Sequence, residues 1–261
     1  MKKKFPKKML WNNELIEKFW NGQEQTRMKE LNFSLLAGSY FLELIQGELY
    51  KNKKYLDFGS GSGELVLSLI TKGYKIGAYD TSIERTKSLE KQISVENKEL
   101  FLGSISDDDG KLFDTIFMNE VIEHIIPDQL DDTINLIKSR LNPGGTLIIT
   151  TPNNEDIDLG ICYCPLCNHT FHRWQHLLSF SKKSLDDLMK KNGIFKKNIH
   201  LVDFSMNRII IEENKKLKKQ IEQLKNPNMK IKEIKNRNTK TKDMCIGAET
   251  HILYIGQLSV S

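Results

Sequence analysis

The sequence lacks any apolar run approaching the roughly 18 residues that a membrane-spanning helix needs. Its start also lacks a signal-peptide pattern, because Asn12, Asn13 and Glu14 stand where an apolar stretch should follow the lysines. Cysteine is scarce: the 261 residues hold four, of which three fall between Cys162 and Cys167. This crowding argues against a disulfide framework and suits reduced thiols or a metal knuckle. We therefore predict a cytoplasmic protein without a membrane span.

Acidic residues are missing from residues 1–8, which carry five lysines, and residues 206–243 hold twelve basic against five acidic residues. Removing these surpluses of five and seven from the formal net charge of +5 leaves −7 on the rest of the chain. The basic character therefore belongs to appendages and does not indicate a nucleic-acid groove on the main body. The length and an apolar content of 39% suffice for one sizeable α/β domain with additions.

The most informative stretch is Lys54–Glu64, in which a short apolar run leads into Gly59, Gly61 and Gly63 and then into a helical pattern. This order predicts a strand, a tight glycine turn and a helix. Glycine allows a positive φ and lets a ligand approach the main chain closely. The free N–H groups at the start of the helix favour anionic or polar parts of a ligand.

A second apolar run, Lys75–Tyr79, ends on Asp80, seventeen residues after Gly63. An acidic residue at the end of the second strand of such a unit can bind both hydroxyls of a ribose. Two nucleoside cofactors fit this pattern, a nicotinamide dinucleotide and S-adenosylmethionine. Asp57 precedes the glycines and would repel a pyrophosphate, whereas it suits the ammonium group of a methionine moiety.

Together with Asn119–His124 (NEVIEH) and Asn142–Asn153 (NPGGTLIITTPN), this stretch resembles the class I S-adenosylmethionine-dependent methyltransferases over about residues 50–205. The resemblance implies a Rossmann-like α/β fold with a seven-stranded, mostly parallel sheet, helices on both faces and an antiparallel last strand. It implies methyl transfer from S-adenosylmethionine, bound by Asp57, Gly59, Ser60, Gly61, Gly63, Asp80, Thr81, Ser104, Ile105 and Asn119.

Ser104 departs from the family pattern, since related enzymes usually have an aspartate there that binds the adenine amino group. Either Ser104 or one of the three acidic residues 107–109 is expected to replace it.

Strands alternate with helices along the chain, which indicates a parallel sheet. We predict strands at 55–58, 75–80, 99–102, 113–118, 146–151, 198–204 and 251–258, with helices at 65–72, 83–97, 127–141 and about 181–191. The predicted domains are an N-terminal helical cap (1–50), a methyltransferase domain (51–205 and 244–261) and a helical hairpin insertion (206–243). An apolar heptad seam in the insertion suggests a homodimer contact through residues 207–240.

The candidate catalytic residues are Glu120, Glu123 and His124, which follow the strand at 113–118. On a helical turn they would share one face, and two carboxylates with an imidazole are ligand-like for a divalent ion. Similar E-x-x-E-H residues, with a later histidine placed like His176, hold a magnesium-type ion in the small-RNA 3′-terminal ribose methyltransferases. Three interpretations remain open: a catalytic Mg²⁺, Mn²⁺ or Zn²⁺, a metal-free base (His124 or His176), and purely structural roles.

The run from Cys162 to His172 is the most unusual local feature, because C-P-x-C presents two thiolates as zinc knuckles do. Cys164, Cys167, His169 and His172 are candidate ligands of a structural zinc, with Cys162 as a substitute. Free cysteines packed as small apolar residues are the alternative. This run and the following F-H-R-W-Q-H resemble methyltransferases associated with bacterial surface-polysaccharide assembly.

We therefore predict an O-methyltransferase acting on a small polar acceptor, a sugar or a phosphoryl or phosphoramidate-type group of capsule or lipopolysaccharide. One alternative is a metal-dependent RNA ribose 2′-O-methyltransferase, which the acidic body disfavours. Another is a non-catalytic methyltransferase-like partner protein. An N-methyltransferase is disfavoured because the usual N-P-P-[YF] motif is absent after the strand at 113–118.

Overall fold

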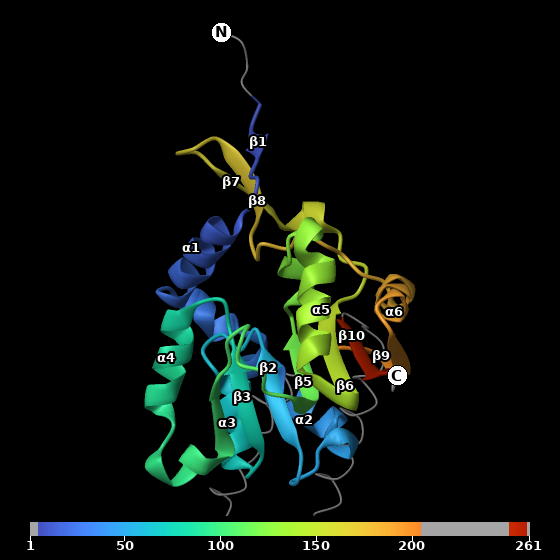
Figure 1. Ribbon diagram of the computed structural model, residues 1–261. Coiled ribbons are helices and arrows are strands. Elements are labelled where there is room, and N and C mark those ends of the chain that lie inside the picture. Colours follow the sequence, from blue (N-terminus) through green and yellow to red (C-terminus); the bar gives the residue numbers. More distant parts are fainter. Residues whose placement is uncertain (1–4, 205–250, 260–261) are drawn as a thin grey trace, which may run out of the picture.

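The computed structural model describes residues 5–204 and 251–259. Its centre is a seven-stranded sheet (Figure 1). In spatial order the strands are β4 (Phe101–Ser104), β3 (Lys75–Tyr79), β2 (Lys54–Phe58), β5 (Phe113–Asn119), β6 (Leu141–Pro152), β10 (His251–Leu258) and β9 (Ile194–Val202). The α-helices are α1 (Asn13–Glu24), α2 (Phe33–Leu44), α3 (Glu64–Thr71), α4 (Ile83–Gln92), α5 (Leu130–Arg140) and α6 (Lys182–Lys191).

Both faces of the sheet are buried, as the near-continuous apolar strands require. Side chains alternate between two cores along each strand: Phe117 packs with α2, α3 and α4, whereas Ile116 and Met118 pack with α5 and α6. The predicted Rossmann-like arrangement with helices on both faces is confirmed.

The strand order reverses at β2, which pairs in parallel with both β3 and β5. The loops that follow β2 and β5 therefore leave the sheet toward opposite sides, which opens a crevice at the carboxyl edge. At the far side, β10 lies antiparallel between β6 and β9. The predicted antiparallel last strand is confirmed.

Several predicted boundaries were wrong. The helix expected at 83–97 ends at Gln92, because Ile93 has an extended backbone and is buried, and η3 (Val95–Leu100) follows. The turn expected at 142–145 belongs to β6, whose pairing with β5 shifts register there. Strand β9 begins at Ile194 and ends at Val202, whereas 198–204 was predicted. The insertion at 206–243 and its dimer seam lie outside the described residues.

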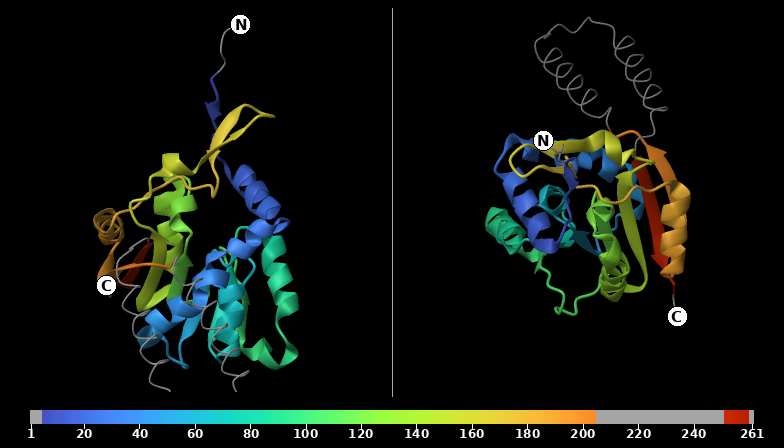
Figure 2. Two further views of the ribbon diagram at one scale, coloured as in Figure 1. Left: turned by 180° about the vertical axis from the view of Figure 1, so that it is seen from behind. Right: turned by 90° about the horizontal axis from the view of Figure 1, so that it is seen from above.

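A second, small sheet was not predicted. It joins β1 (Lys7–Lys8), β8 (His169–His172) and β7 (Ile161–Cys164). Figure 1 and the rear view in Figure 2 show it rising above the edge of the main sheet where β6 ends. The remaining short helices are η1 (Arg27–Leu31), η2 (Gln46–Glu48), η4 (Ile122–His124), η5 (Pro127–Gln129) and η6 (Ile157–Gly160). Among the described helices, none has the length and apolar character needed to cross a bilayer.

Candidate active site

The glycine loop after β2 has the backbone that its sequence demands. Gly59, Gly61 and Gly63 have φ values of 81°, 54° and 87°, in the left-handed region that side chains rarely adopt. A Cβ on Gly59 would lie 2.5 Å from a methyl group of Val121, and one on Gly63 would lie 2.3 Å from a methyl group of Leu89. The loop is therefore held tightly against the segment that follows β5 and against helix α4.

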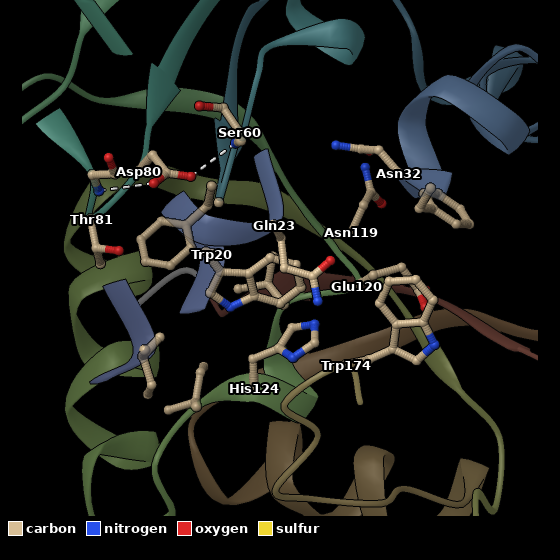
Figure 3. Close-up of a pocket in the computed structure, with 18 of the residues that line it drawn as sticks. Trp20, Gln23, Asn32, Ser60, Asp80, Thr81, Asn119, Glu120, His124 and Trp174 are labelled. Carbon is tan, nitrogen blue, oxygen red and sulfur yellow. Dashed lines mark hydrogen bonds between the residues drawn. The ribbon is translucent and has the colours of Figure 1, made fainter. Parts of the chain in front are cut away.

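Asp80 follows β3 and is bonded to the glycine loop. Its Oδ2 accepts a hydrogen bond from the Gly61 N–H at 2.9 Å, and its Oδ1 accepts one from the Ser82 N–H at 2.9 Å (Figure 3). Arg85 forms a longer ion pair with Asp80, at 3.9 Å. Each carboxylate oxygen keeps a second lone pair, so the group can still accept hydroxyl hydrogen bonds from a ligand in the cavity.

Asp57, the last residue but one of β2, is buried beneath the loop. Burial raises the pKa of Asp57 to about 8, and the neighbouring carboxylates of Glu64 and Asp80 add to the rise. Negative groups so close together in a buried setting favour a positively charged ligand. The ammonium and sulfonium groups of S-adenosylmethionine have that charge.

A cavity of about 1450 Å³ runs along the carboxyl edge of the sheet, from the glycine loop to His176 and His251. Helix α1 and the segment leading into α2 form one of its walls, as the predicted N-terminal cap requires. Figure 3 shows Trp20 of α1, His124 and Trp174 facing the same space as Ser60 and Asp80.

Most of the predicted cofactor residues line this cavity: Gly59, Ser60, Gly61, Asp80, Thr81 and Asn119. Gly63 and Asp57 do not line it. Ser104 instead bonds Glu90 through its hydroxyl at 2.7 Å, and Ile105 is buried against Gly77.

The cavity wall at the expected adenine end is provided by Asp107, one of the acidic residues offered as the alternative to Ser104. The Tyr79 hydroxyl bonds Asp107, and the pKa of Tyr79 is raised, by burial first and by Asp107 second.

The sequence predicted Glu120 on a helical turn, but in the structure Glu120 does not lie on one. Its φ of 52° is left-handed, so the chain bends away from β5 and η4 begins only at Ile122. Its Oε2 lies 3.4 Å from Nε2 of His251, and its Oε1 is buried without a partner. The predicted helical turn over Glu120, Glu123 and His124 is therefore wrong, while the role of Glu120 stays a prediction.

His251, the first residue of β10, lines the cavity and was not predicted as a site residue. Its ring packs edge-on against Phe204, with centroids 5.4 Å apart, and Phe204 packs against Phe33 at 4.9 Å. Burial, the largest single influence, lowers the pKa of His251. The charge and hydrogen bond of Glu120, with the charges of Asp203 and Glu155, together outweigh burial and raise the pKa above its usual value.

Glu123 is buried behind the cavity wall, beside His124, which lines the cavity. The Glu123 side chain is 1% exposed, and its Oε2 accepts a hydrogen bond from the Thr151 hydroxyl at 3.0 Å. Its Oε1 lies 4.0 Å from Nε2 of His124. Neither Oε1 of Glu123 nor Nδ1 of His124 has a hydrogen-bond partner, although both are buried. Such orphaned polar atoms are costly and often mark the place of a ligand or ion.

His176 joins this pair from a distant loop. One donor atom each from Glu123, His124 and His176 lies within 4.8 Å of the other two. Burial, and next the charge of Glu120, raise the pKa of Glu123 well above its usual value. Burial, and next His176, lower the pKa of His124 to about 3, so its ring is neutral. Neutral imidazole and carboxylate are the forms that bind Mn²⁺ or Zn²⁺. The His124 ring is already in that form, and a bound cation would displace the proton that burial favours on Glu123. These residues therefore fit a divalent ion.

Glu155 and His172 were not predicted here. Glu155 follows β6, and its Oε2 bonds Nδ1 of His176, while its Oε1 lies 3.5 Å from Nε2 of His172. Glu155, His172 and His176 form a second group of donor atoms within 4.8 Å of one another. No local sequence signal brings residues 155, 172 and 176 together with 123 and 124.

The zinc set predicted from Cys164, Cys167, His169 and His172 is not assembled in the described residues. In the β7–β8 hairpin Cys164 is paired with His169, whereas His172 is paired with Ile161. Three residues along a strand are roughly 10 Å, so His172 lies far from the two thiols. Hydrogen bonds from Cys167, and next from the Leu166 N–H, lower the pKa of Cys164, as expected for a thiol held in a C-P-x-C turn.

A family model described as a methyltransferase domain matches residues 29–195. The human mitochondrial ubiquinone biosynthesis O-methyltransferase is 27% identical over 155 residues, which are 54% of this chain and 41% of that protein. Its Bos taurus counterpart is 28% identical over 162 residues, 57% of this chain and 43% of that protein. The chain thus spans less than half the length of these curated relatives.

Solved structures agree in fold. The Burkholderia thailandensis 1,6-didemethyltoxoflavin-N1-methyltransferase, bound to S-adenosylhomocysteine, aligns with a TM-score of 0.60 at 13% identity, over 97% of this chain and 94% of that one. The Haemonchus contortus phosphoethanolamine N-methyltransferase 2, in complex with S-adenosylmethionine, aligns at 0.56 and 15% identity, over 92% and 60%. Identities this low support the fold alone.

Proposed function

This chain belongs to the methyltransferase domain family and is an S-adenosylmethionine-dependent methyltransferase, and from this premise we propose that it methylates a hydroxyl oxygen of a small saccharide. Oxygen is the proposed acceptor atom because the curated relatives are named as O-methyltransferases. The resemblance of residues 162–176 to enzymes of surface-polysaccharide assembly supports a saccharide destined for capsule or lipopolysaccharide.

In this proposal the donor lies along the glycine loop. Asp80 accepts the ribose hydroxyls, and Asp57 with Glu64 favours the cationic methionine end of the donor. Helix α1 forms a wall of the cavity that holds the donor and the acceptor. Methyl transfer is then an in-line displacement, to which the protein contributes mainly by holding the acceptor oxygen at attack distance.

The observation that carries the proposal is the set of orphaned polar atoms at 119–124. Among the described residues, seven buried side-chain nitrogen or oxygen atoms lack a hydrogen-bond partner, and four of them belong to Asn119, Glu120, Glu123 and His124. These atoms belong to the last residue of β5 and to the segment that follows it, at the same edge of the sheet as the glycine loop. An acceptor with hydroxyl groups, or an ion that binds such an acceptor, would satisfy them.

Glu123, His124 and His176 would hold a divalent ion, which when bound lowers the pKa of an acceptor hydroxyl. The protein also has a group that can take the proton. His251 bonds Glu120, and the raised pKa of His251 makes it a stronger base than an ordinary histidine. We assign the proton-accepting role to this pair.

The charge of the cavity wall supports a neutral acceptor. The wall contains eight Asp and Glu side chains against three Lys and Arg side chains. This surplus repels the phosphates of RNA and disfavours phosphoryl acceptors. Phe33, Phe204 and the two tryptophans at 20 and 174 offer apolar ring faces on which the C–H face of a sugar can pack.

The test is a screen for release of S-adenosylhomocysteine with neutral monosaccharides, sugar phosphates, a catechol and a short RNA with a 3′-terminal diol. Turnover with neutral saccharides alone supports the proposal, whereas turnover only with the catechol or the RNA overturns the acceptor class. The metal-dependent RNA alternative draws support from the Glu123–His124–His176 cluster. Dialysis against a chelator, followed by Mg²⁺, Mn²⁺ or Zn²⁺, tests the ion with every active acceptor.

A further inference from the structure

Two groups of donor atoms share His176, and they differ in how their atoms are satisfied. In one group, Oε1 of Glu123 and Nδ1 of His124 have no partner. In the other, both oxygens of Glu155 face imidazole nitrogens, of His176 and of His172. A group whose donor atoms already bond one another needs no ion to satisfy them. The unpartnered atoms of Glu123 and His124 do need a ligand. The two groups therefore have different tasks.

We propose that Glu155 is a positioning residue, which fixes the ring orientation and tautomer of His176 so that Nε2 of His176 is free to bind a divalent ion. The inference rests on the proposed function, since it concerns the same ion site. It adds to that function a residue that does not touch the ion and acts through His176.

The hydrogen bonds assign the tautomer of His176. A carboxylate oxygen can only accept, so Nδ1 of His176, which bonds Oε2 of Glu155, carries the proton. When the ring carries this proton alone, Nε2 keeps its lone pair. Histidine ligands of metal ions commonly donate their other N–H to a carboxylate in this way, which also raises the basicity of the ligand nitrogen.

His172 supports the same arrangement from behind. Its Nδ1 accepts hydrogen bonds from the backbone N–H groups of Trp174, at 3.3 Å, and His176, at 3.1 Å. The proton of the neutral ring is therefore on Nε2, which faces Oε1 of Glu155 at 3.5 Å. The rings of His172 and His176 stack with centroids 4.5 Å apart. Glu155 is thus held by two imidazoles, each with one assigned tautomer.

The backbone around Glu155 is anchored as a positioning role requires. The Ser179 hydroxyl donates to the Glu155 carbonyl at 2.8 Å, and the Asn154 N–H donates to the Phe180 carbonyl at 2.7 Å. On the other side, the N–H groups of Leu177 and Leu178 donate to the Glu123 carbonyl at 2.8 and 3.1 Å. The loop that carries His176 is therefore tied both to Glu155 and to the ion cluster.

The experiment measures Mn²⁺ binding by calorimetry to the full chain, for the wild type, Glu155→Gln and Glu155→Leu. Loss of such a supporting partner costs about 10- to 100-fold in metal affinity, so we expect about tenfold weaker binding for Glu155→Gln and about 100-fold for Glu155→Leu. Glu48→Gln is the matched control, because it removes one carboxylate charge and an ion pair with Lys197 away from the cavity. The control should bind Mn²⁺ as the wild type does.

Two further measurements separate positioning from damage to the fold. The affinity for S-adenosylmethionine should stay within twofold of wild type in every variant. The ¹⁵N NMR signals of the His176 ring should report the Nδ1–H tautomer in the metal-free wild type and a mixture of tautomers in Glu155→Leu. This readout does not depend on the ion.

The outcomes are distinguishable. If the wild type binds Mn²⁺ and Glu155→Leu binds it equally well, the positioning role is overturned while the proposed function stands. If the wild type binds no Mn²⁺, or His176 has the same tautomer in both proteins, the inference also fails. Failure of the proposed function appears separately, as absence of methyl transfer to any saccharide.

Discussion

The two halves of the site differ in how their polar groups are satisfied. In the cofactor half, both oxygens of Asp80 already accept backbone N–H groups from residues within nineteen positions along the chain. In the acceptor half, four polar atoms between Asn119 and His124 have no partner. The first half also has unpartnered atoms, Oγ of Ser60 and Nε of Arg85, but its central carboxylate is bonded by backbone groups from its own βαβ unit. The second half is assembled from distant loops and has twice as many unpartnered atoms. Each prediction below tests this contrast.

The largest effect is expected from the glycine loop, where Gly63→Ala should destabilise the protein by about 3 kcal/mol. The new Cβ would meet Leu89 at 2.3 Å, and a side chain at a φ of 87° adds strain. Gly61→Ala is the matched control, because its Cβ meets only the Asn32 amide at 3.7 Å and costs about 1 kcal/mol from strain alone. Urea unfolding measures both. Equal losses would show that packing against Leu89 does not hold the loop.

The next largest effect is on donor binding, which Asp80→Ala should weaken at least about tenfold, since hydrogen bonds to a charged group contribute about 1.5–3 kcal/mol. The same change removes the acceptor from the Gly61 and Ser82 N–H groups. Calorimetry with S-adenosylmethionine checks it, with Asp128→Ala, an exposed acid outside the cavity wall, as the control. An unchanged dissociation constant would remove the ribose assignment.

The cofactor half was largely predictable from sequence, and the acceptor half was not. The first apolar run, the glycines and Asp80 lie within one βαβ unit, so their proximity follows from local structure. The register of β7 and β8, which takes His172 to Glu155, depends on pairing that no local pattern reveals. The left-handed φ of Glu120 also has no signal, because glutamate rarely adopts it.

The distances along the chain explain the remaining misses. Glu155, which follows β6, contacts the predicted His176, and His251, at the start of β10, contacts Glu120. Both contacts join residues that are far apart along the chain. The E-x-x-E-H motif identifies two members of the cluster and the resemblance adds His176, whereas Glu155 and His251 have no such signal. A sequence pattern predicts a site well where the chain supplies the partners locally, as it does for Asp80.

A smaller effect should follow from the charge of Asp57. Its folded pKa of about 8 lies above the usual value of 3.8, so the folded state binds more protons between these pH values. Stability of the ligand-free protein should therefore fall as pH rises from about 4 to 8, and Asp57→Asn should remove this part of the slope. Melting temperatures at pH 6 and 9 measure it. Affinity for the cationic donor should rise over the same range in the wild type only.

The smallest effect tests the contact between the cap and the acceptor half. The indole N–H of Trp20 donates to Oε1 of Gln175 at 3.1 Å, and the Gln175 amide donates to the His124 carbonyl at 2.9 Å. Gln175 is fully buried, so Trp20→Phe leaves its oxygen unpaired and should cost about 1–2 kcal/mol. Trp11→Phe is the control, because it makes the same ring change where the indole packs edge-on against Phe19. Urea unfolding compares the free energies of unfolding of the two variants.

Because the polar groups of the two halves are satisfied differently, donor affinity and turnover should respond differently to Trp20→Phe. Donor affinity should change by less than twofold, since Asp80 and the glycine loop keep all their hydrogen bonds. Turnover should fall further than donor affinity, because the carbonyl of His124 is bonded to the amide that loses its partner. Equal losses of donor binding and turnover would mean that the cap affects the cofactor half and the acceptor half alike. The contrast between the two halves would then fail.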